Sequence, residues 1–429
     1  MKKILFVVAT LLLTGKAIAQ AEPANYVTAV TKFTQYYNHD QPDSIFSMFS
    51  PEMKASLPIG NFKPTTIQLK SQYGSLLKTE FVKITQTLAI YKATFQNSTF
   101  LLNLALNAQN KLTGLLLSPY TEDKIAAGFA FDPSLDETPI LLKTLTGTVS
   151  GALVMPKNPS GKIPVVIIIA DAGATDRDGN NEKTGISANT YKILANDLGK
   201  NGIATVRYDK RLVGASMTKS KESELRIEDY SDDAMGLANM LNDDQRFSKV
   251  VLFGHGEGAL VAALAVNDSP VKGFISAEWN ADNGDKILKE QMKSKPQFLQ
   301  DELKTFLDSL RKGKMTPNID PALYYIARPS IQNFIMSWCR YDPIRGIKRI
   351  KLPILIIQGT TDKTVPAENG QRLKKAKSEA TLLEIKNMNH ILKEAPADEE
   401  QNMATYSKPD LPLKPELIPA LVEFINKLR

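Results

Sequence analysis

Hydrophobic and polar positions follow two different rhythms along the 429 residues. Near the N-terminus, apolar residues recur every three to four positions, the spacing that places side chains on one face of a helix. These residues are Tyr26, Val30, Phe33 and Tyr37. A second apolar group at 45–49 predicts a short following helix.

Three β-like runs come next, at 81–95, 100–107 and 112–117, with polar breaks between them that are typical of hairpin connections. Two helices on a curved antiparallel sheet is the simplest arrangement, so we expect a small α+β domain over 20–118. This pattern resembles the cystatin-like, nuclear-transport-factor-like domains that precede some secreted bacterial hydrolases. A segment with Pro and Gly, 119–137, is expected to be a linker.

From residue 138 to 429 strands alternate with helices, which predicts an α/β fold with a doubly wound, mostly parallel sheet. A hairpin with strands at 144–150 and 151–155 precedes an entirely apolar strand, 165–169, of the kind that helices cover on both faces. Further strands are expected at 203–208, 250–253, 271–277, 354–357 and 381–385, with helices at 190–201 and 227–241. The charged segment 281–340 lacks this alternation, and we expect a helical cap over the carboxyl ends of the strands.

The run Val250 to Gly258 ends in Gly254-His255-Gly256-Glu257-Gly258. This run resembles the strand-to-helix turn of α/β-hydrolases, which normally reads G-x-S-x-G and presents the nucleophilic serine at its apex. Here the apex is Gly256, which has no side-chain oxygen. His255 and Glu257 flank the apex and are interpreted as structural turn residues.

Two further residues follow strands in the order that α/β-hydrolases use for their acid and their histidine. Asp362 comes after the strand at 354–357, and His390 after the strand at 381–385. Alternative interpretations are a helix N-cap for Asp362 and a surface-loop histidine for His390. We predict that Gly256, Asp362 and His390 meet at one end of the sheet.

Two stretches carry a closer resemblance, Ala170-Asp171-Ala172-Gly173-Ala174-Thr175-Asp176-Arg177-Asp178-Gly179-Asn180 and Tyr208-Asp209-Lys210-Arg211-Leu212-Val213-Gly214-Ala215-Ser216. They are similar to the oxyanion loop and the second motif of secreted esterases related to serine aminopeptidases. The resemblance implies carboxylic-ester hydrolysis through an acyl-enzyme, on a small acyl-ester or peptide-like substrate. It also implies that His390 shuttles the proton, that Asp362 orients its ring, and that N–H groups at Ala172 and Glu257 hold the oxyanion.

The chain departs from that family at three positions. Glycine replaces the serine at 256, residues 171–173 read Asp-Ala-Gly where the family has Gly-Ser-Gly, and Leu212 replaces a glycine. A carboxylate at Asp171, if it faced the site, would repel the oxyanion. We therefore expect weak or lost ester hydrolysis, with slow general-base catalysis by His390 on a water in the serine's place as one route.

Two other functions stay open: a pseudoenzyme that binds an acyl or peptide-like ligand without turnover, and a protein whose N-terminal domain has the main role. Restoring serine at position 256 should discriminate among them. Cys339 has no such turn around it and is interpreted as a buried structural thiol.

Composition narrows the remaining classes. The net charge of +7 is modest, and no basic tract interleaved with aromatics suggests nucleic-acid binding. With three histidines and no ligand-like spacing, we expect neither metal nor cofactor. Lys2, Lys3, the apolar run 4–13 and the Ala17-Ile18-Ala19 motif predict a signal peptide, 1–19, cut after Ala19. The mature protein is then expected to be secreted or periplasmic, soluble and free of the membrane.

Overall fold

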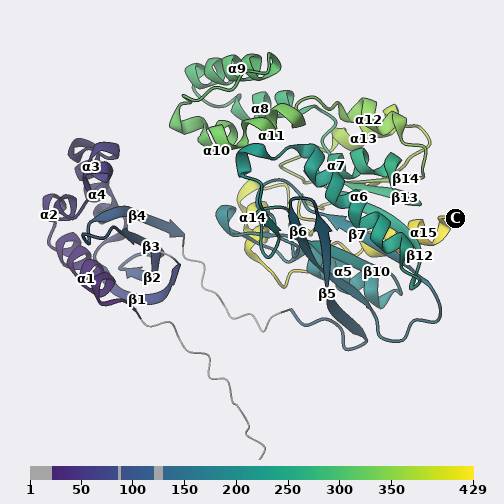
Figure 1. The fold of residues 1–429 in the computed structure, drawn as a ribbon, viewed down its shortest axis with the longest axis horizontal. Coiled ribbons are helices and arrows are strands. Elements are labelled where there is room, and N and C mark those ends of the chain that lie inside the picture. Colours follow the sequence, from purple (N-terminus) through teal and green to yellow (C-terminus); the bar gives the residue numbers. More distant parts are fainter. Residues whose placement is uncertain (1–21, 86–87, 120–128) are drawn as a thin grey trace, which may run out of the picture. The chain divides into compact units, whose positions relative to one another are not determined.

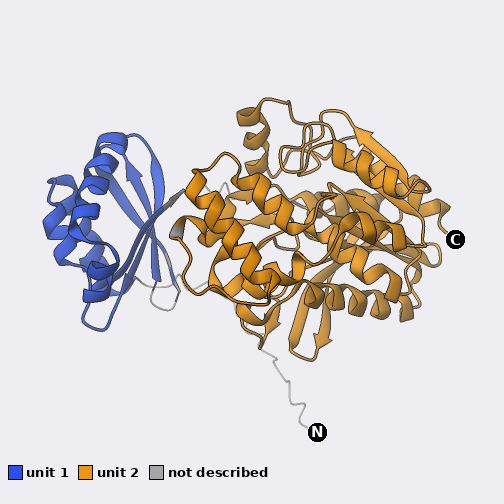
Figure 2. Ribbon diagram, turned by 90° about the horizontal axis from the view of Figure 1, so that it is seen from above, with its two compact units in different colours: residues 1–124 blue, residues 125–429 orange. Residues whose placement is uncertain are grey.

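The computed structural model describes residues 22–85, 88–119 and 129–429, and the chain divides into two compact units, 1–124 and 125–429 (Figures 1 and 2). The predicted signal peptide and its cleavage site lie outside the described residues. Within the described ranges, no helix is both long enough and apolar enough to span a bilayer.

Unit 1 packs four helices against a four-stranded antiparallel sheet of order β1-β2-β3-β4. The elements are α1 (Ala24–Asn38), α2 (Pro42–Ser47), α3 (Pro51–Ser56), α4 (Ile59–Tyr73), β1 (Leu76–Thr85), β2 (Leu88–Phe95), β3 (Thr99–Leu106) and β4 (Leu112–Pro119). The predicted apolar face of α1 is buried, because Val30, Phe33 and Tyr37 join the core that the sheet supplies.

Two predictions for this unit are wrong in detail. The run expected as one strand over 81–95 is a hairpin, in which β1 and β2 pair antiparallel with Phe81 opposite Tyr91. Helices α3 and α4 were not predicted. Helix α4 carries Pro64 inside it and buries only Phe62, so its sequence has little helical periodicity to detect.

Unit 2 contains a nine-stranded sheet of order β11-β6-β10-β7-β12-β13-β14-β15, with β5 paired to β6 (Figure 1). Strands from β10 to β15 along this order run parallel to their neighbours, and β6 is antiparallel to β10. The strands are β5 (Leu135–Thr144), β6 (Gly147–Pro156), β7 (Ile163–Ile169), β10 (Ala204–Tyr208), β11 (Met217–Thr218), β12 (Phe247–His255), β13 (Gly273–Ala277), β14 (Ile354–Gly359) and β15 (Thr381–Ile385).

Helices cover both faces of this sheet, as the apolar strand predicts. Val165 and Ile167 of β7 pack into the core formed with α6 (Ile227–Asp243) and α7 (Glu257–Ala265). Val166 and Ile168, which point the other way, pack with α5 (Thr190–Lys200) and α15 (Leu417–Lys427). The doubly wound α/β prediction is confirmed.

The order of the strands places the functional end. From β7 the chain passes to β10 on one side and then to β12 on the other, so the carboxyl ends of β7 and β12 lie together where the winding reverses. Open α/β sheets place their sites at such a switch point.

Boundaries at the start of unit 2 differ from expectation. Strand β5 begins at Leu135, inside the segment 119–137 that was expected to be a linker; residues 120–128 lie outside the described ranges. The hairpin turns at 145–146, between β5 and β6, rather than near residue 150, and so it starts earlier than predicted.

The insertion predicted over 281–340 is helical. It contains α8 (Gly284–Met292), α9 (Gln297–Arg311), α10 (Tyr324–Ala327) and α11 (Gln332–Trp338). These helices share a core of their own around Leu303, Phe306 and Leu307. Its role as a cap stays a prediction.

Candidate active site

The predicted nucleophile turn is present between β12 and α7. Gly256 lies at its apex with φ +52° and ψ −117°, and its N–H donates to the carbonyl of Ala277. The flanking glycines are required by close packing: a Cβ on Gly254 would lie 2.4 Å from the carbonyl oxygen of Gly258, and a Cβ on Gly258 would lie 2.3 Å from that of Ile169. The sequence folds into this turn because larger residues cannot occupy these positions.

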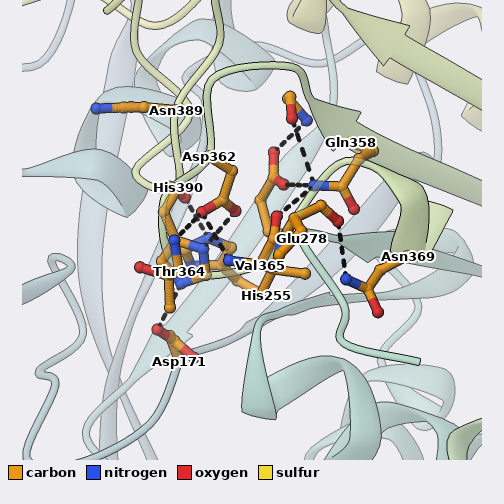
Figure 3. A network of polar contacts seen from close by, with 12 residues as sticks. Asp171, His255, Glu278, Gln358, Asp362, Thr364, Val365, Asn369, Asn389 and His390 are labelled. Atoms are coloured by element: carbon orange, nitrogen blue, oxygen red, sulfur yellow. Dashed lines mark hydrogen bonds and ion pairs between the residues drawn. The ribbon is translucent and has the colours of Figure 1, made fainter. Parts of the chain in front are cut away.

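The predicted histidine–carboxylate couple is also formed (Figure 3). His390 Nδ1 lies 2.7 Å from Asp362 Oδ2, and both side chains are buried. The other oxygen of Asp362 accepts the backbone N–H groups of Thr364 and Val365. These bonds fix the carboxylate beneath the imidazole, so both the N-cap-like contacts and the contact with His390 are real.

The place of the missing serine side chain is filled by Asp171. A Cβ on Gly256 would lie 1.9 Å from Asp171 Oδ1, which shows that the carboxylate occupies the space a side chain at 256 would need. Asp171 Oδ1 accepts the backbone N–H of Glu257 at 2.9 Å, and Asp171 Oδ2 lies 2.9 Å from His390 Nε2. The expectation of a vacant position open to water is therefore wrong.

The predicted oxyanion pair is only half available. The N–H of Glu257, one expected donor, already bonds the carboxylate of Asp171. Ala172, the other, is exposed, and its N–H has no hydrogen-bond partner among the described residues. Asp171 does face the site as anticipated, but it takes the oxyanion's position as well as opposing its charge.

Two carboxylates determine the charge of His390. Burial alone would lower the pKa of His390, but Asp362 and Asp171, one on each ring nitrogen, raise this pKa well above its ordinary value. For Asp171, burial acts in the opposite direction to the attraction of His390, which holds the pKa of this carboxyl well below its usual range. Since both ring nitrogens face acceptors, His390 is an imidazolium and has no free nitrogen to act as a base.

A second histidine, His255, together with Tyr191 links the loop that carries Asp171 to the loop that carries His390. The hydroxyl of Tyr191 accepts the N–H of Asp171 at 2.9 Å and lies 2.8 Å from His255 Nδ1. His255 Nε2 lies 2.7 Å from the carbonyl oxygen of His390 and must donate to it, which leaves Nδ1 to accept from Tyr191. Burial lowers the pKa of His255 to about 4, so this ring is neutral and structural, as predicted.

The charged residues of the two family-like motifs hold the loop that carries Asp171. Lys210 donates through Nζ to the carbonyl of Asp171, and the same ammonium lies 3.7 Å from Glu257 Oε1. Asp209 accepts from the side chain and backbone N–H of Arg177. These residues position the loop that carries Asp171. In the sequence, the only indication of this role was that they belong to the two family-like motifs.

Glu278 is a site residue that sequence reasoning missed. It follows β13, is fully buried, and accepts the N–H of Gly359 at 2.7 Å and a bond from the Gln358 amide. Burial and the neighbouring Asp362, to which it is hydrogen-bonded, raise the pKa of Glu278 well above its usual value. The available signal was an ionisable residue directly after an apolar strand.

Cys339 lies away from these strand ends, in the helical insertion, where it lines a cavity of about 340 Å³ with Asp285 and Arg311. Burial raises the pKa of its thiol to about 12. A thiol with so high a pKa is a poor nucleophile. Cys339 is half-buried, so the prediction of a buried thiol is wrong in degree, and its structural role stays a prediction.

Comparisons with known proteins relate both units to known families. Residues 184–279 match the family model "Serine aminopeptidase, S33", and residues 30–115 match a family described as a protein of unknown function, DUF3887. Esterase EstD of Thermotoga maritima is 24% identical over 370 residues, which cover 84% of this chain and 86% of the esterase.

Solved structures were also compared. Est1E from Butyrivibrio proteoclasticus with ferulic acid bound has 17% identity and a TM-score of 0.46, over 67% of this chain and all of Est1E. The α/β-hydrolase GrgF from Penicillium sp. sh18 has 14% identity and a TM-score of 0.46, over 68% of this chain and 99% of GrgF.

Unit 2 thus combines the strand order, the nucleophile turn and the acid–histidine couple of an α/β-hydrolase. Unit 2 therefore has the α/β-hydrolase fold; residues 184–279 match the serine aminopeptidase family, and the chain is a homologue of esterase EstD. Residues 30–115, in unit 1, match the DUF3887 family.

Proposed function

We propose that this protein is an exported member of the esterase lineage in which serine-dependent ester hydrolysis has been lost, and in which Asp171 occupies the nucleophile's place. The carrying observation is the carboxylate of Asp171 at 2.9 Å from both His390 Nε2 and the N–H of Glu257. These two groups are the ones that a serine hydrolase reserves for its nucleophile and its oxyanion.

The serine route is closed on three counts. Gly256 supplies no hydroxyl. His390 carries a proton on each ring nitrogen, so it cannot accept one from a hydroxyl or a water. The Glu257 N–H is already occupied, and an oxyanion placed there would meet the negative charge of Asp171.

Substitutions at two positions test this proposal with p-nitrophenyl butyrate as substrate and a fluorophosphonate probe for a reactive serine. Gly256→Ser alone should stay inactive, because its Cβ would lie 1.9 Å from Asp171 Oδ1. The double variant Asp171→Gly/Gly256→Ser removes that overlap and frees His390. It should gain hydrolysis by about 10³-fold over the wild type and react with the probe.

Two controls separate the causes. Asp171→Gly alone opens the site without a nucleophile and should not react with the probe, whereas His390→Ala in the double variant should abolish the gain. Butyrate-ester hydrolysis by the wild type that disappears in His390→Ala would contradict the proposal, as would full activity of Gly256→Ser.

Export is supported by the basic, apolar and small-residue order of positions 1–19. N-terminal sequencing of the exported chain should begin at residue 20. A cytoplasmic protein that starts at residue 1 would exclude export.

A further inference from the structure

We infer that Asp171 is itself a nucleophile, which attacks a saturated carbon bearing a weakly basic leaving group, such as the carbon of an alkyl halide. This inference rests on the proposed function, because both place Asp171 where the serine side chain would be. It goes further by assigning a reaction class to the carboxylate.

The contacts of the carboxylate are those that covalent catalysis by an aspartate requires. A carboxylate that has been alkylated must be released by water attacking its own Cγ. That step needs an N–H donor at one carboxyl oxygen and a base beside the other. Asp171 Oδ1 has the N–H of Glu257, and Asp171 Oδ2 has His390, oriented by Asp362.

The attacking group is also accessible. About 25% of the Asp171 side chain is exposed, whereas the Asp362 side chain beneath His390 is fully buried. Of these two carboxylates at the imidazole, only Asp171 can meet a substrate. Tyr191 and Lys210 hydrogen-bond to the backbone N–H and carbonyl of Asp171, so the position of the carboxylate is fixed before any ligand binds.

Basicity selects the substrate. When a carboxylate adds to an alkyl ester, the adduct can expel either the carboxylate or the alkoxide. The carboxylate is less basic by roughly 12 pKa units, so it leaves again and the original ester is regenerated. Displacement at a saturated carbon has no such adduct. His390 lies on the side of the attacking oxygen, while the leaving group departs on the opposite side and receives no proton from it. A halide needs none.

The reaction balances as follows. Asp171 Oδ2 forms a bond to the carbon as the carbon–halogen bond breaks, and halide leaves with the electron pair. The Asp171 ester is neutral, so His390 loses one of its two charged partners and releases its Nε2 proton to water. Neutral His390 then takes a proton from a second water, which attacks Cγ. The oxyanion on Oδ1 is held by Glu257, and the alcohol leaves with the proton from His390. The sum is R–X + H₂O giving R–OH, H⁺ and X⁻.

The test uses 1-bromobutane, bromide release and intact-mass analysis, in the full chain carrying Cys339→Ala to remove the one thiol. The protein with Asp171 and His390 intact should release bromide over many turnovers, and in H₂¹⁸O its Asp171 should acquire ¹⁸O. His390→Ala should release at most one equivalent and retain one butyl group on Asp171. Asp171→Asn should release none.

A matched control is Asp176→Asn, a carboxylate of the same loop whose Oδ1 accepts two backbone N–H groups that an asparagine also satisfies. In the His390→Ala background it should still be butylated at Asp171. If the His390→Ala protein is folded and carries no butyl group, or carries it equally on other carboxylates, the inference is overturned. The proposed function then still stands if Asp171→Gly/Gly256→Ser gains esterase activity, so the two failures are distinguishable.

Discussion

At the level of single residues, Gly256 and Asp171 have to be considered as a pair. A side chain at 256 and a carboxylate at 171 exclude one another, because they would occupy the same space. The carboxylate also changes His390, which in a working triad keeps Nε2 free and here has an acceptor on both nitrogens. One substitution in the loop thus alters the protonation of a residue more than two hundred positions away.

The charge state of His390 gives a prediction that does not depend on any substrate. Its pKa is raised, so its ion pairs are fully formed below its ordinary pKa of about 6.5, and their contribution is lost as pH rises through the folded value. The pKa of Asp171 is lowered, so its ionised carboxylate contributes to the free energy of unfolding above about pH 3.9, the ordinary pKa of an aspartate. This contribution is lost as pH falls through the pKa of the folded state. NMR of ¹³C-labelled histidine should therefore show His390 doubly protonated at pH 8.

Asp171→Asn removes one of the two charges and should let His390 lose its proton at a lower pH. The chain has three histidines, so single substitutions assign each ring. His255, whose pKa is about 4, serves as the internal control and should stay neutral in both proteins. An unshifted His390 titration in Asp171→Asn would show that Asp171 does not hold the proton.

Leu212 gives a second prediction at this scale. It has φ +65°, a left-handed conformation that L side chains rarely adopt. The motif resemblance implies a glycine at this position. Leu212→Gly should relieve this strain and stabilise unit 2 by up to about 1 kcal/mol, a rise in midpoint of about 2 °C in thermal unfolding.

The matched control is Gly214→Ala in the same turn, which also has positive φ. Its Cβ would lie 2.2 Å from Asp209 Oδ2, so this variant should lose about 2 kcal/mol or more. A neutral Gly214→Ala together with a destabilised Leu212→Gly would refute the strain argument.

The positions of the site residues could be predicted from the sequence where those residues directly follow a strand. Gly256, Asp362 and His390 could be placed together because parallel strands bring their carboxyl ends to one edge. The contact of Asp171 with His390 could not be predicted, since it depends on the exact path of a loop held by Tyr191 and Lys210. The hydrophobic pattern of the sequence does not indicate that Tyr191 or Lys210 contacts that loop.

At the level of elements, helix α5 connects the oxyanion loop to the end of β12, at the nucleophile turn, through one hydroxyl. Tyr191 on α5 both accepts from the N–H of Asp171 and donates to His255. Tyr191→Phe leaves two buried polar groups without a partner and should destabilise unit 2 by about 2 kcal/mol in urea unfolding.

Tyr208, at the end of β10, is the matched control. It is as buried as Tyr191, but its hydroxyl has no hydrogen-bond partner among the described residues. Tyr208→Phe should therefore be neutral or slightly stabilising. Equal losses in both variants would mean that ring packing, and not the hydroxyl bridge, accounts for the effect.

The elements themselves were predictable in proportion to their hydrophobic pattern. Strand β7 is apolar throughout and was placed within two residues, because burial on both faces leaves no polar position. Helix α4 buries one residue, Phe62, and contains Pro64, so its sequence resembles a loop. Its helical state is set by packing in unit 1, which local pattern does not report.

At the level of the whole molecule, the described hydrophobic clusters divide between the two units. All members of the aromatic-rich cluster around Phe33, Tyr37 and Phe95 lie between residues 26 and 117, in unit 1. The two large clusters on the sheet faces lie entirely within unit 2. A unit with its own core and its own sheet has what independent folding requires.

A fragment of residues 129–429 should therefore fold alone, with a thermal midpoint within about 2 °C of the corresponding transition in the full chain, a margin near 1 kcal/mol for a unit of this size. His390 in the fragment should keep its doubly protonated NMR signature, because the ring's partners, Asp171 and Asp362, both belong to unit 2. A fragment of residues 22–119 should likewise show a cooperative transition, since its core is complete. If the larger fragment melts far below the full chain, or if His390 becomes neutral in it, then unit 1 contributes to the stability or the electrostatics of the site, and the site would have to be studied only in the intact chain.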